Sequence, residues 1–344
     1  MQISVEDLMR QASAMKATDI HICAGAPLTF RIAKDLVFIG KENLTAQESR
    51  DLALKLLTTD QVSILERKLD FDAIIIDAHG RYRVNVGYFN GSVGATIRVL
   101  PERPRTIEEL QLPPSVRELS YHTKGLVLVT GSTSQGKTTT VAAMIDEINS
   151  TRRKHTITIE DPIEYIHTNK MGIVRQREVG RDTESFAIGL RAALRQDPDV
   201  IAIGEMRDYE TIKIALTAAE TGVMVFSTLH IISIDKIIER ILSYAPQDDQ
   251  RHLRHLLADS LQGIIHQELV PTIDGKKRVA CEVLLVNDAV RHIIRRRDTH
   301  FLRDVITMGR NQGMNTMNSS IAALIEEKAV APEVAESVMR NYAR

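Results

Sequence analysis

The segment GSTSQGKTTT, residues 131–140, has the residue types and spacing of a phosphate-binding loop. Its Gly131, Gly136, Lys137 and Thr138 follow the Walker A pattern G-x-x-x-x-G-K-[ST]. In such a P-loop, successive backbone N–H groups surround phosphate oxygens, the lysine reaches the β- and γ-phosphates, and the hydroxyl binds Mg²⁺. We therefore expect ATP to bind through Gly131, Ser132, Thr133, Ser134, Gln135, Gly136, Lys137, Thr138 and Thr139.

Acidic residues and one histidine follow the neighbouring predicted strands. In open α/β sheets, ligands bind beyond the carboxyl ends of the strands. An ATPase needs carboxylates there that hold Mg²⁺ through water and orient a nucleophilic water, and a histidine can sense the γ-phosphate. The candidates are Glu160, Asp161 and Glu164 after TITI (156–159), Glu205 after VIAIG (200–204), and His230 after VMVFST (223–228).

Each acid has an alternative interpretation as a solvated carboxylate that caps a helix. That alternative remains open for Asp161 and Asp208, and Asp199 is interpreted as the end of a turn. For Glu160, Glu164, Glu205 and His230 together, at the ends of strands in one sheet, the nucleotide site is the better interpretation.

The elements that must position these residues form an α/β pattern. Short apolar strands alternate with helical segments after residue 115, which predicts a mostly parallel sheet with helices on both faces. Helices are expected at 137–150, 183–196, 208–222 and 233–243, a hairpin around Asp274-Gly275 at 268–286, and only helices over 287–343.

The first hundred residues predict a separate mixed α/β domain. It has helices at 5–16 and 45–67, and strands in HICAG, LTFRI, RYRVNVGYF (81–89) and GATIRVL (94–100). Because strand side chains repeat every two residues, Arg81, Arg83 and Asn85 should project from one face. Residues 101–114 contain four prolines and are expected to link this domain, 1–100, to an ATPase domain, 115–344.

Composition excludes several classes of protein. The net charge of −1 disfavours a dedicated nucleic-acid binder, and the two distant cysteines give neither a disulfide framework nor a cysteine zinc site. The basic runs at 152–154 and 295–297 are better explained as solvated surface than as a DNA contact. Residues 1–20 do not resemble a signal peptide and no apolar run suits a membrane helix, so the expected location is the cytoplasm.

The motifs also carry a family resemblance that covers nearly the whole chain. TITIEDPIEYIH resembles the "Asp box" of secretion-superfamily ATPases, DPDVIAIGEMRD their Walker B segment, and AAETGVMVFSTLH their "His box". The segment VRQREVGRDTESFAIGLRAALRQDPDV and the later DAVRHIIR (288–295) are similar to the PilT/PilU-like branch, the retraction ATPases of type IV pili. DIHICAG and RYRVN also match in place. The chain lacks the four-cysteine insertion of assembly ATPases, which favours retraction.

The resemblance implies a cytoplasmic homo-hexameric ring docked at the inner face of the cytoplasmic membrane. Each protomer would have a PAS-like N-terminal domain and a RecA-like ATPase domain, with ATP at their interface. Partners would be an inner-membrane platform protein, the pilus machinery and a paralogous retraction ATPase. In this arrangement Glu164 orients water, Thr138, Glu160 and Glu205 serve Mg²⁺, and arginines of the first domain reach the γ-phosphate. The matching arginines are Arg81, Arg83 and Arg98, with salt bridges at a sheet edge as the alternative.

The chain departs from the family pattern in two places. Ser134 and Gln135 replace the usual Gly and Ser, so the loop loses a flexible position, and Ile231-Ile232 replace polar residues after His230. These changes leave a second hypothesis open, an accessory or weakly active ring subunit that modulates a partner ATPase. A related secretion or assembly ATPase and a DNA translocase are further alternatives.

Overall fold

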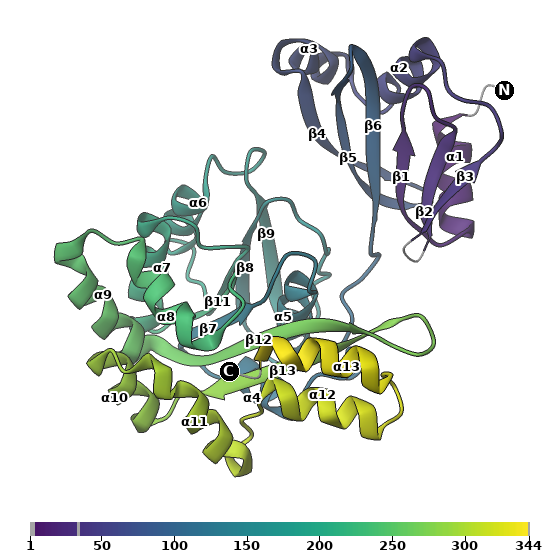
Figure 1. Ribbon diagram of the computed structural model, residues 1–344. Coiled ribbons are helices and arrows are strands. Elements are labelled where there is room, and N and C mark those ends of the chain that lie inside the picture. Colours follow the sequence, from purple (N-terminus) through teal and green to yellow (C-terminus); the bar gives the residue numbers. More distant parts are fainter. Residues whose placement is uncertain (1–3, 33–34, 343–344) are drawn as a thin grey trace. The chain divides into compact units, whose positions relative to one another are not determined.

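The computed structural model describes residues 4–32 and 35–342, which divide into two compact units between Glu102 and Arg103 (Figure 1). Both units combine helices with a sheet, which confirms the predicted α/β class. Residues 103–114 belong to the second unit, where Ile107 and Leu112 lie in the core. The part of the proline-rich segment around Ile107 and Leu112 is therefore packed against the second unit.

In the first unit, all neighbouring strands of the sheet are antiparallel, in the order β3-β2-β1-β6-β5-β4. One face packs on helices α1, α2 and α3, and the other carries polar side chains. In β5, Tyr82 and Val84 are buried, whereas Arg81, Arg83 and Asn85 lie on the opposite face, as predicted. The elements are α1 Val5–Ala14, β1 Ala17–Ile22, β2 Leu28–Ile32, β3 Asp35–Ile39, α2 Ala46–Leu54, α3 Thr59–Lys68, β4 Asp70–Asp77, β5 Gly80–Phe89 and β6 Ser92–Leu100.

The second unit contains the mostly parallel sheet that the alternating pattern predicts. Its strand order is β13-β12-β7-β11-β10-β8-β9, with only β13 antiparallel to its neighbour among the described strands. P-loop strand β7 lies centrally, between β11 and β12. The strands are β7 Gly125–Thr130, β8 His155–Glu160, β9 Ile173–Glu178, β10 Val200–Ile203, β11 Met224–Leu229, β12 Leu261–Pro271 and β13 Lys277–Leu285.

Helices cover both faces of this sheet because its central strands are apolar on both sides. In β7, Leu126 and Leu128 face one core and Val127 and Val129 face the other. The first core is completed by α6 to α11, and the second by α4 and α5. These helices are α4 Pro114–Ser120, α5 Lys137–Thr151, α6 Phe186–Ala193, α7 Tyr209–Glu220, α8 Ile234–Ser243, α9 Gln247–Ser260, α10 Asp288–Arg296 and α11 Leu302–Met308.

The C-terminal helices pack on the β12–β13 hairpin (Figure 1). Helices α12 Met317–Glu326 and α13 Pro332–Met339 bury Ile321 and Ala335 against Val270 and Ala280 of the hairpin. Short 3₁₀ segments, Thr299–Phe301, Gly309–Gln312 and Arg340–Tyr342, complete the helical end. This confirms the helical prediction for 287–342; residue 343 lies outside the described residues.

The differences from the predicted elements have local causes. Helix α6 is shorter than 183–196 because Ser185 caps its start by accepting from the Ile188 N–H. The sequence pattern alone does not identify strands β3, β4 and β9 or helices α4 and α9. Strand β9 and helix α9 are rich in polar residues, and α4 is short. Strand β9 is an edge strand with the sequence IVRQRE, so only its first two residues are apolar; of these, Ile173 is exposed and Val174 is buried.

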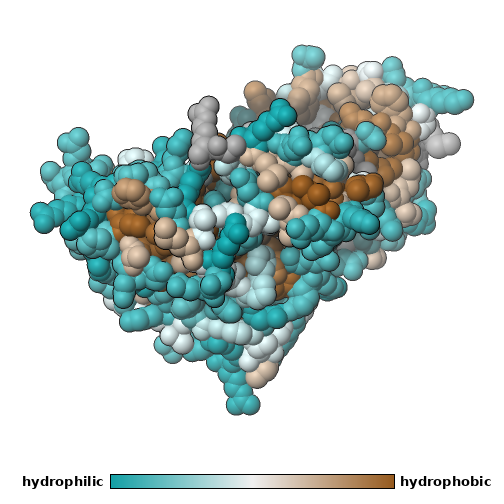
Figure 2. Space-filling model, turned by 60° about the horizontal axis from the view of Figure 1, so that its bottom comes forward, coloured by the Kyte–Doolittle hydropathy of each residue, from teal (hydrophilic) through white to brown (hydrophobic). Residues whose placement is uncertain are grey.

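Hydrophilic residues cover most of the face shown in Figure 2, and apolar residues gather in separate patches. Over the described residues, the helices are too short or too polar to cross a bilayer.

Candidate functional site

The loop 131–136 connects β7 to α5 and has the conformation that its glycines permit. Gly131 has φ +144°, and a Cβ there would lie 2.5 Å from the carbonyl oxygen of Gln267 in β12. Gly136 has φ +81° and immediately precedes α5. Both glycines are therefore needed by backbone geometry. The N-terminus of α5 opens directly on the loop, which is the arrangement expected for an anion site.

Lys137 folds back onto the loop. Its Nζ donates to the carbonyl oxygens of Gly131 at 2.9 Å and Ser132 at 2.7 Å, and lies 3.2 Å from Nδ1 of His230. Burial lowers the pKa of Lys137 to about 8, and the nearby Glu205 charge acts in the opposite direction. The ammonium is thus charged at neutral pH but only partly compensated. A phosphate would supply the missing counter-charge.

His230 connects Lys137 to Glu205. Its Nε2 lies 3.6 Å from Oε2 of Glu205, and the same carboxylate oxygen lies 2.5 Å from Nε of Arg207. Burial and the Lys137 charge lower the pKa of His230, so the neutral ring is favoured. Because Nδ1 faces an ammonium, the ring proton is assigned to Nε2, toward the carboxylate.

Glu160 and Thr138 line a small, mostly apolar cavity of about 40 Å³, together with Thr158, Gly204 and Thr228. Oε1 of Glu160 accepts from Oγ1 of Thr158 at 2.6 Å and from Nε2 of Gln176 at 3.0 Å. Burial raises the pKa of Glu160. Hydroxyl and carboxylate oxygens are ligands that Mg²⁺ prefers, so the oxygens of Thr138 and Glu160 are of the kind that would fit that ion.

Glu164 lies beside Glu160. Its charge raises the pKa of Glu160, while its backbone N–H, which donates to that carboxylate, lowers it. The neighbouring Tyr165 hydroxyl lies 2.8 Å from Oγ1 of Thr139, so this predicted nucleotide-binding side chain contacts the Asp-box segment. Thr133 Oγ1 is 3.5 Å from Nδ1 of His230.

Two other acids have structural roles. Asp208 caps α7 by accepting from the Thr211 N–H at 2.8 Å. Asp199 accepts from Lys154 Nζ at 2.6 Å and from the His155 N–H at 2.9 Å, before β10 begins. The capping interpretation is correct for Asp208, whereas the contacts of Asp199 join it to the start of β8. Asp161 is exposed.

The three candidate arginines lie on the polar face of the first unit's sheet. Arg83 and Arg98 are direct cross-strand partners in β5 and β6, and Arg81 lies two residues along β5. Nε of Arg98 donates to Oδ1 of Asp19 at 2.9 Å, and Nε of Arg83 is 3.8 Å from Asp72. Asp19, Asp72, Arg83 and Arg98 line one open cavity of about 320 Å³. Salt bridges of the predicted alternative kind are therefore present.

Sequence reasoning missed Arg207, Tyr165 and Gln267 as neighbours of the loop. Arg207 stands two residues after Glu205 in GEMRD, and that spacing could have indicated it. No local signal identifies Gln267, because its contact with the loop spans more than 130 residues.

Comparison with known proteins gives consistent matches over the chain. The family described as "Type II/IV secretion system protein" matches residues 1–343. The "Type IV pilus retractation ATPase PilT" of Pseudomonas aeruginosa is 38% identical over 332 residues, covering 96% of each chain. The "Type IV pilus ATPase PilU" of the same organism is 36% identical and covers 95% of this chain and 86% of its own.

Among solved structures, a crystal structure of the pilus retraction motor PilT with bound ADP has a TM-score of 0.89 and 42% identity, covering 97% of this chain and 96% of that one. The two chains therefore share their fold across both units.

Proposed function

The chain belongs to the type II/IV secretion system protein family, and from this premise we propose that it is an ATP-hydrolysing ring motor that powers type IV pilus retraction. The observation that carries the proposal is the contact series Lys137–His230–Glu205 at the mouth of the phosphate-binding loop. An accessory subunit that does not hydrolyse ATP would not need a charged lysine, a neutral histidine and a carboxylate in contact one after another. Identity to the relatives named PilT and PilU is nearly equal, 38% and 36%, and does not separate the two hypotheses. The contact series is therefore the reason that we favour the motor.

We propose that the loop amides and Lys137 bind the β- and γ-phosphates. The Lys137 ammonium would then exchange the carbonyl oxygens of Gly131 and Ser132 for phosphate oxygens. Thr138, Glu160 and Glu205 would hold Mg²⁺ through the nucleotide and water, and the ion would neutralise charge on the phosphates. Glu164 orients the attacking water. His230, released from Lys137, reports whether the γ-phosphate is present. These roles are supported by the contacts above and by the family resemblance.

Mechanical work would follow from a change in the arrangement of the two units. ATP drives such a step only because it favours one arrangement over another. We propose a homo-hexamer at the cytoplasmic face of the inner membrane, which passes the change to a platform protein so that pilin subunits leave the fibre base. A paralogous ATPase is a further proposed partner.

For Arg81, Arg83 and Arg98 we propose contact with the γ-phosphate in the assembled ring. An arginine in this role can contribute roughly 10³–10⁵-fold to the rate. We expect at least one of the three alanine variants to lose about 1000-fold in kcat while its Kd for Mg·ADP stays within about threefold. The control is Arg67→Ala, on an exposed part of α3. If all three variants keep more than a tenth of the wild-type kcat, the arginine assignment is wrong.

Deletion in the native host tests the direction of the motor. We expect extra surface pili and loss of surface motility, because fibres would still assemble but could not be withdrawn. Pili are counted by electron microscopy and motility by colony expansion, with complementation as the control. Bald cells would point to an assembly ATPase, and unchanged cells with no turnover by the purified protein would favour the accessory subunit.

A further inference from the structure

The phosphate-binding loop contains a residue in a conformation that its side chain disfavours. Ser134 has φ +62°, in the left-handed region, where a Cβ crowds the backbone. The family pattern has glycine at this position. The loop must therefore be held in shape by contacts outside itself, since Ser134 does not favour that shape.

The next residue, Gln135, makes two such contacts, both with strand β12. Oε1 of its side chain accepts from the backbone N–H of Leu269 at 2.6 Å, and its own carbonyl accepts from Nε2 of Gln267 at 2.6 Å. Gln267 is 1% exposed, and its backbone carbonyl is the atom that excludes a Cβ at Gly131. Strand β12 thus contacts the loop at its beginning and near its end.

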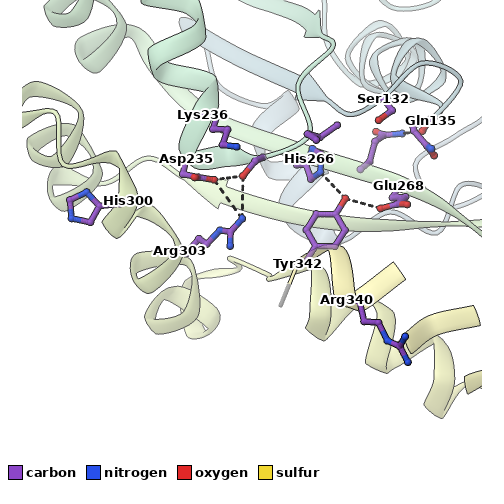
Figure 3. Close-up of a pocket in the computed structure, with 13 residues that line it drawn as sticks. Ser132, Gln135, Asp235, Lys236, His266, Glu268, His300, Arg303, Arg340 and Tyr342 are labelled. Carbon is purple, nitrogen blue, oxygen red and sulfur yellow. Dashed lines mark hydrogen bonds and ion pairs between the residues drawn. The ribbon is translucent and has the colours of Figure 1, made fainter. Parts of the chain in front are cut away.

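Strand β12 is itself held in place by β7 and by the C-terminal helical end. Nδ1 of His266 lies 3.1 Å from Oγ1 of Thr130 at the end of β7, and its Nε2 lies 3.1 Å from the Tyr342 hydroxyl. That hydroxyl also donates to Oε2 of Glu268 at 2.7 Å (Figure 3). These contacts fix the position of β12 beside the loop.

The flank of the loop beside β12 has little packing of its own. Ser132 and Gln135 line an open cavity of about 840 Å³, on the wall opposite His300 and Arg303 (Figure 3). The hydrogen bonds of Gln135 to β12 are therefore contacts that can hold the loop on this side.

We propose that Gln135 is a positioning residue: it fastens the loop to β12 and so keeps Ser134 in the left-handed conformation that phosphate binding requires. This inference rests on the proposed function, because it concerns the same loop. Both residues depart from the family pattern, with Ser134 in place of glycine and Gln135 in place of serine. In this proposal the Gln135 side chain compensates for the conformational cost of Ser134.

A double-mutant cycle tests the proposal. Gln135→Met keeps the length of the side chain and removes the acceptor, and Ser134→Gly removes the conformational cost. With Mg²⁺ and a fluorescent ADP analogue as the probe, Gln135→Met is expected to raise Kd about tenfold, as the loss of a hydrogen bond of ordinary strength would. In the Ser134→Gly background, the same change should raise Kd less than about threefold, because glycine needs no support.

The control is Gln247→Met, at an exposed position at the start of α9, which should leave Kd unchanged. For ATP hydrolysis, KM should rise more than kcat falls, and the melting temperature without nucleotide should stay near wild type. If Gln135→Met raises Kd equally in both backgrounds, or in neither while the wild type binds nucleotide, the inference is overturned but the proposed function is not. Absence of binding by the wild type would instead count against the proposed function.

Discussion

Replacing Lys137 by alanine is expected to lower kcat/KM for ATP hydrolysis by at least about 1000-fold. The ammonium is the cation that the structure places at the loop, 2.9 Å from the Gly131 carbonyl and 2.7 Å from the Ser132 carbonyl. Phosphate binding would exchange these neutral partners for charged oxygens. Alanine offers neither charge nor donor there, so both binding and transition-state stabilisation should be lost.

Turnover is measured by phosphate release from the purified protein over a range of Mg·ATP concentrations. The matched control is Lys124→Ala, which removes an exposed lysine just before β7, at the opposite end of the same strand. Folding should survive in Lys137→Ala, because burial already disfavours this ammonium, as its pKa of about 8 indicates. Hydrolysis above a tenth of the wild-type rate by a folded variant would remove the basis of the site assignment.

The fold was predictable wherever local sequence determines burial. All six residues of β7, GLVLVT, are buried, so an unbroken apolar run correctly indicated a central strand. Asp274-Gly275 likewise indicated the hairpin, and Gly275 has φ +78°. Strand β9 could not be found in this way, because IVRQRE pairs only at the sheet edge and most of its side chains stay partly exposed.

The site was predictable as a set of strand ends but not as a set of contacts. Glu205 and His230 follow adjacent parallel strands, β10 and β11, so their proximity follows from the sheet order. That Gln135 would bind β12 depends on which strand lies beside β7, and no pattern near residue 135 contains that information. The spacing of apolar residues along the chain indicates which side chains are buried, whereas contacts between distant segments depend on the order of the strands in the sheet.

The charges at the mouth of the loop explain how nucleotide could be sensed. Lys137 and Glu205 lie on opposite sides of one neutral imidazole, so His230 is held between a cation and an anion. Arrival of a phosphate would draw Lys137 away from Nδ1. The histidine would then keep the Glu205 carboxylate and the Thr133 hydroxyl as its neighbours. The end of β11, which carries the histidine, could then change position. In the proposed mechanism, Glu205 is therefore the residue on which both the charge balance and the response would depend.

Glu205→Gln is accordingly expected to bind Mg·ADP within about threefold of wild type but to hydrolyse ATP roughly 100- to 1000-fold more slowly. The amide has the shape of the carboxylate but lacks the charge that lies 3.6 Å from His230 Nε2 and 2.5 Å from Arg207 Nε. Without that charge the pKa of His230 falls further, since Glu205 is the group that raises it. Binding is preserved because Lys137 and the loop amides are untouched.

Binding and single-turnover hydrolysis, measured on the same preparation, separate these two effects. Glu220→Gln, an exposed exchange at the end of α7, is the control for loss of one negative charge and should behave as wild type. Near-normal hydrolysis by Glu205→Gln would show that the carboxylate serves only its ion pair with Arg207. Loss of nucleotide binding together with hydrolysis would mean that Glu205 is needed for the bound state, either through Mg²⁺ or through the loop, since a residue that acts only on the reaction leaves the bound state intact.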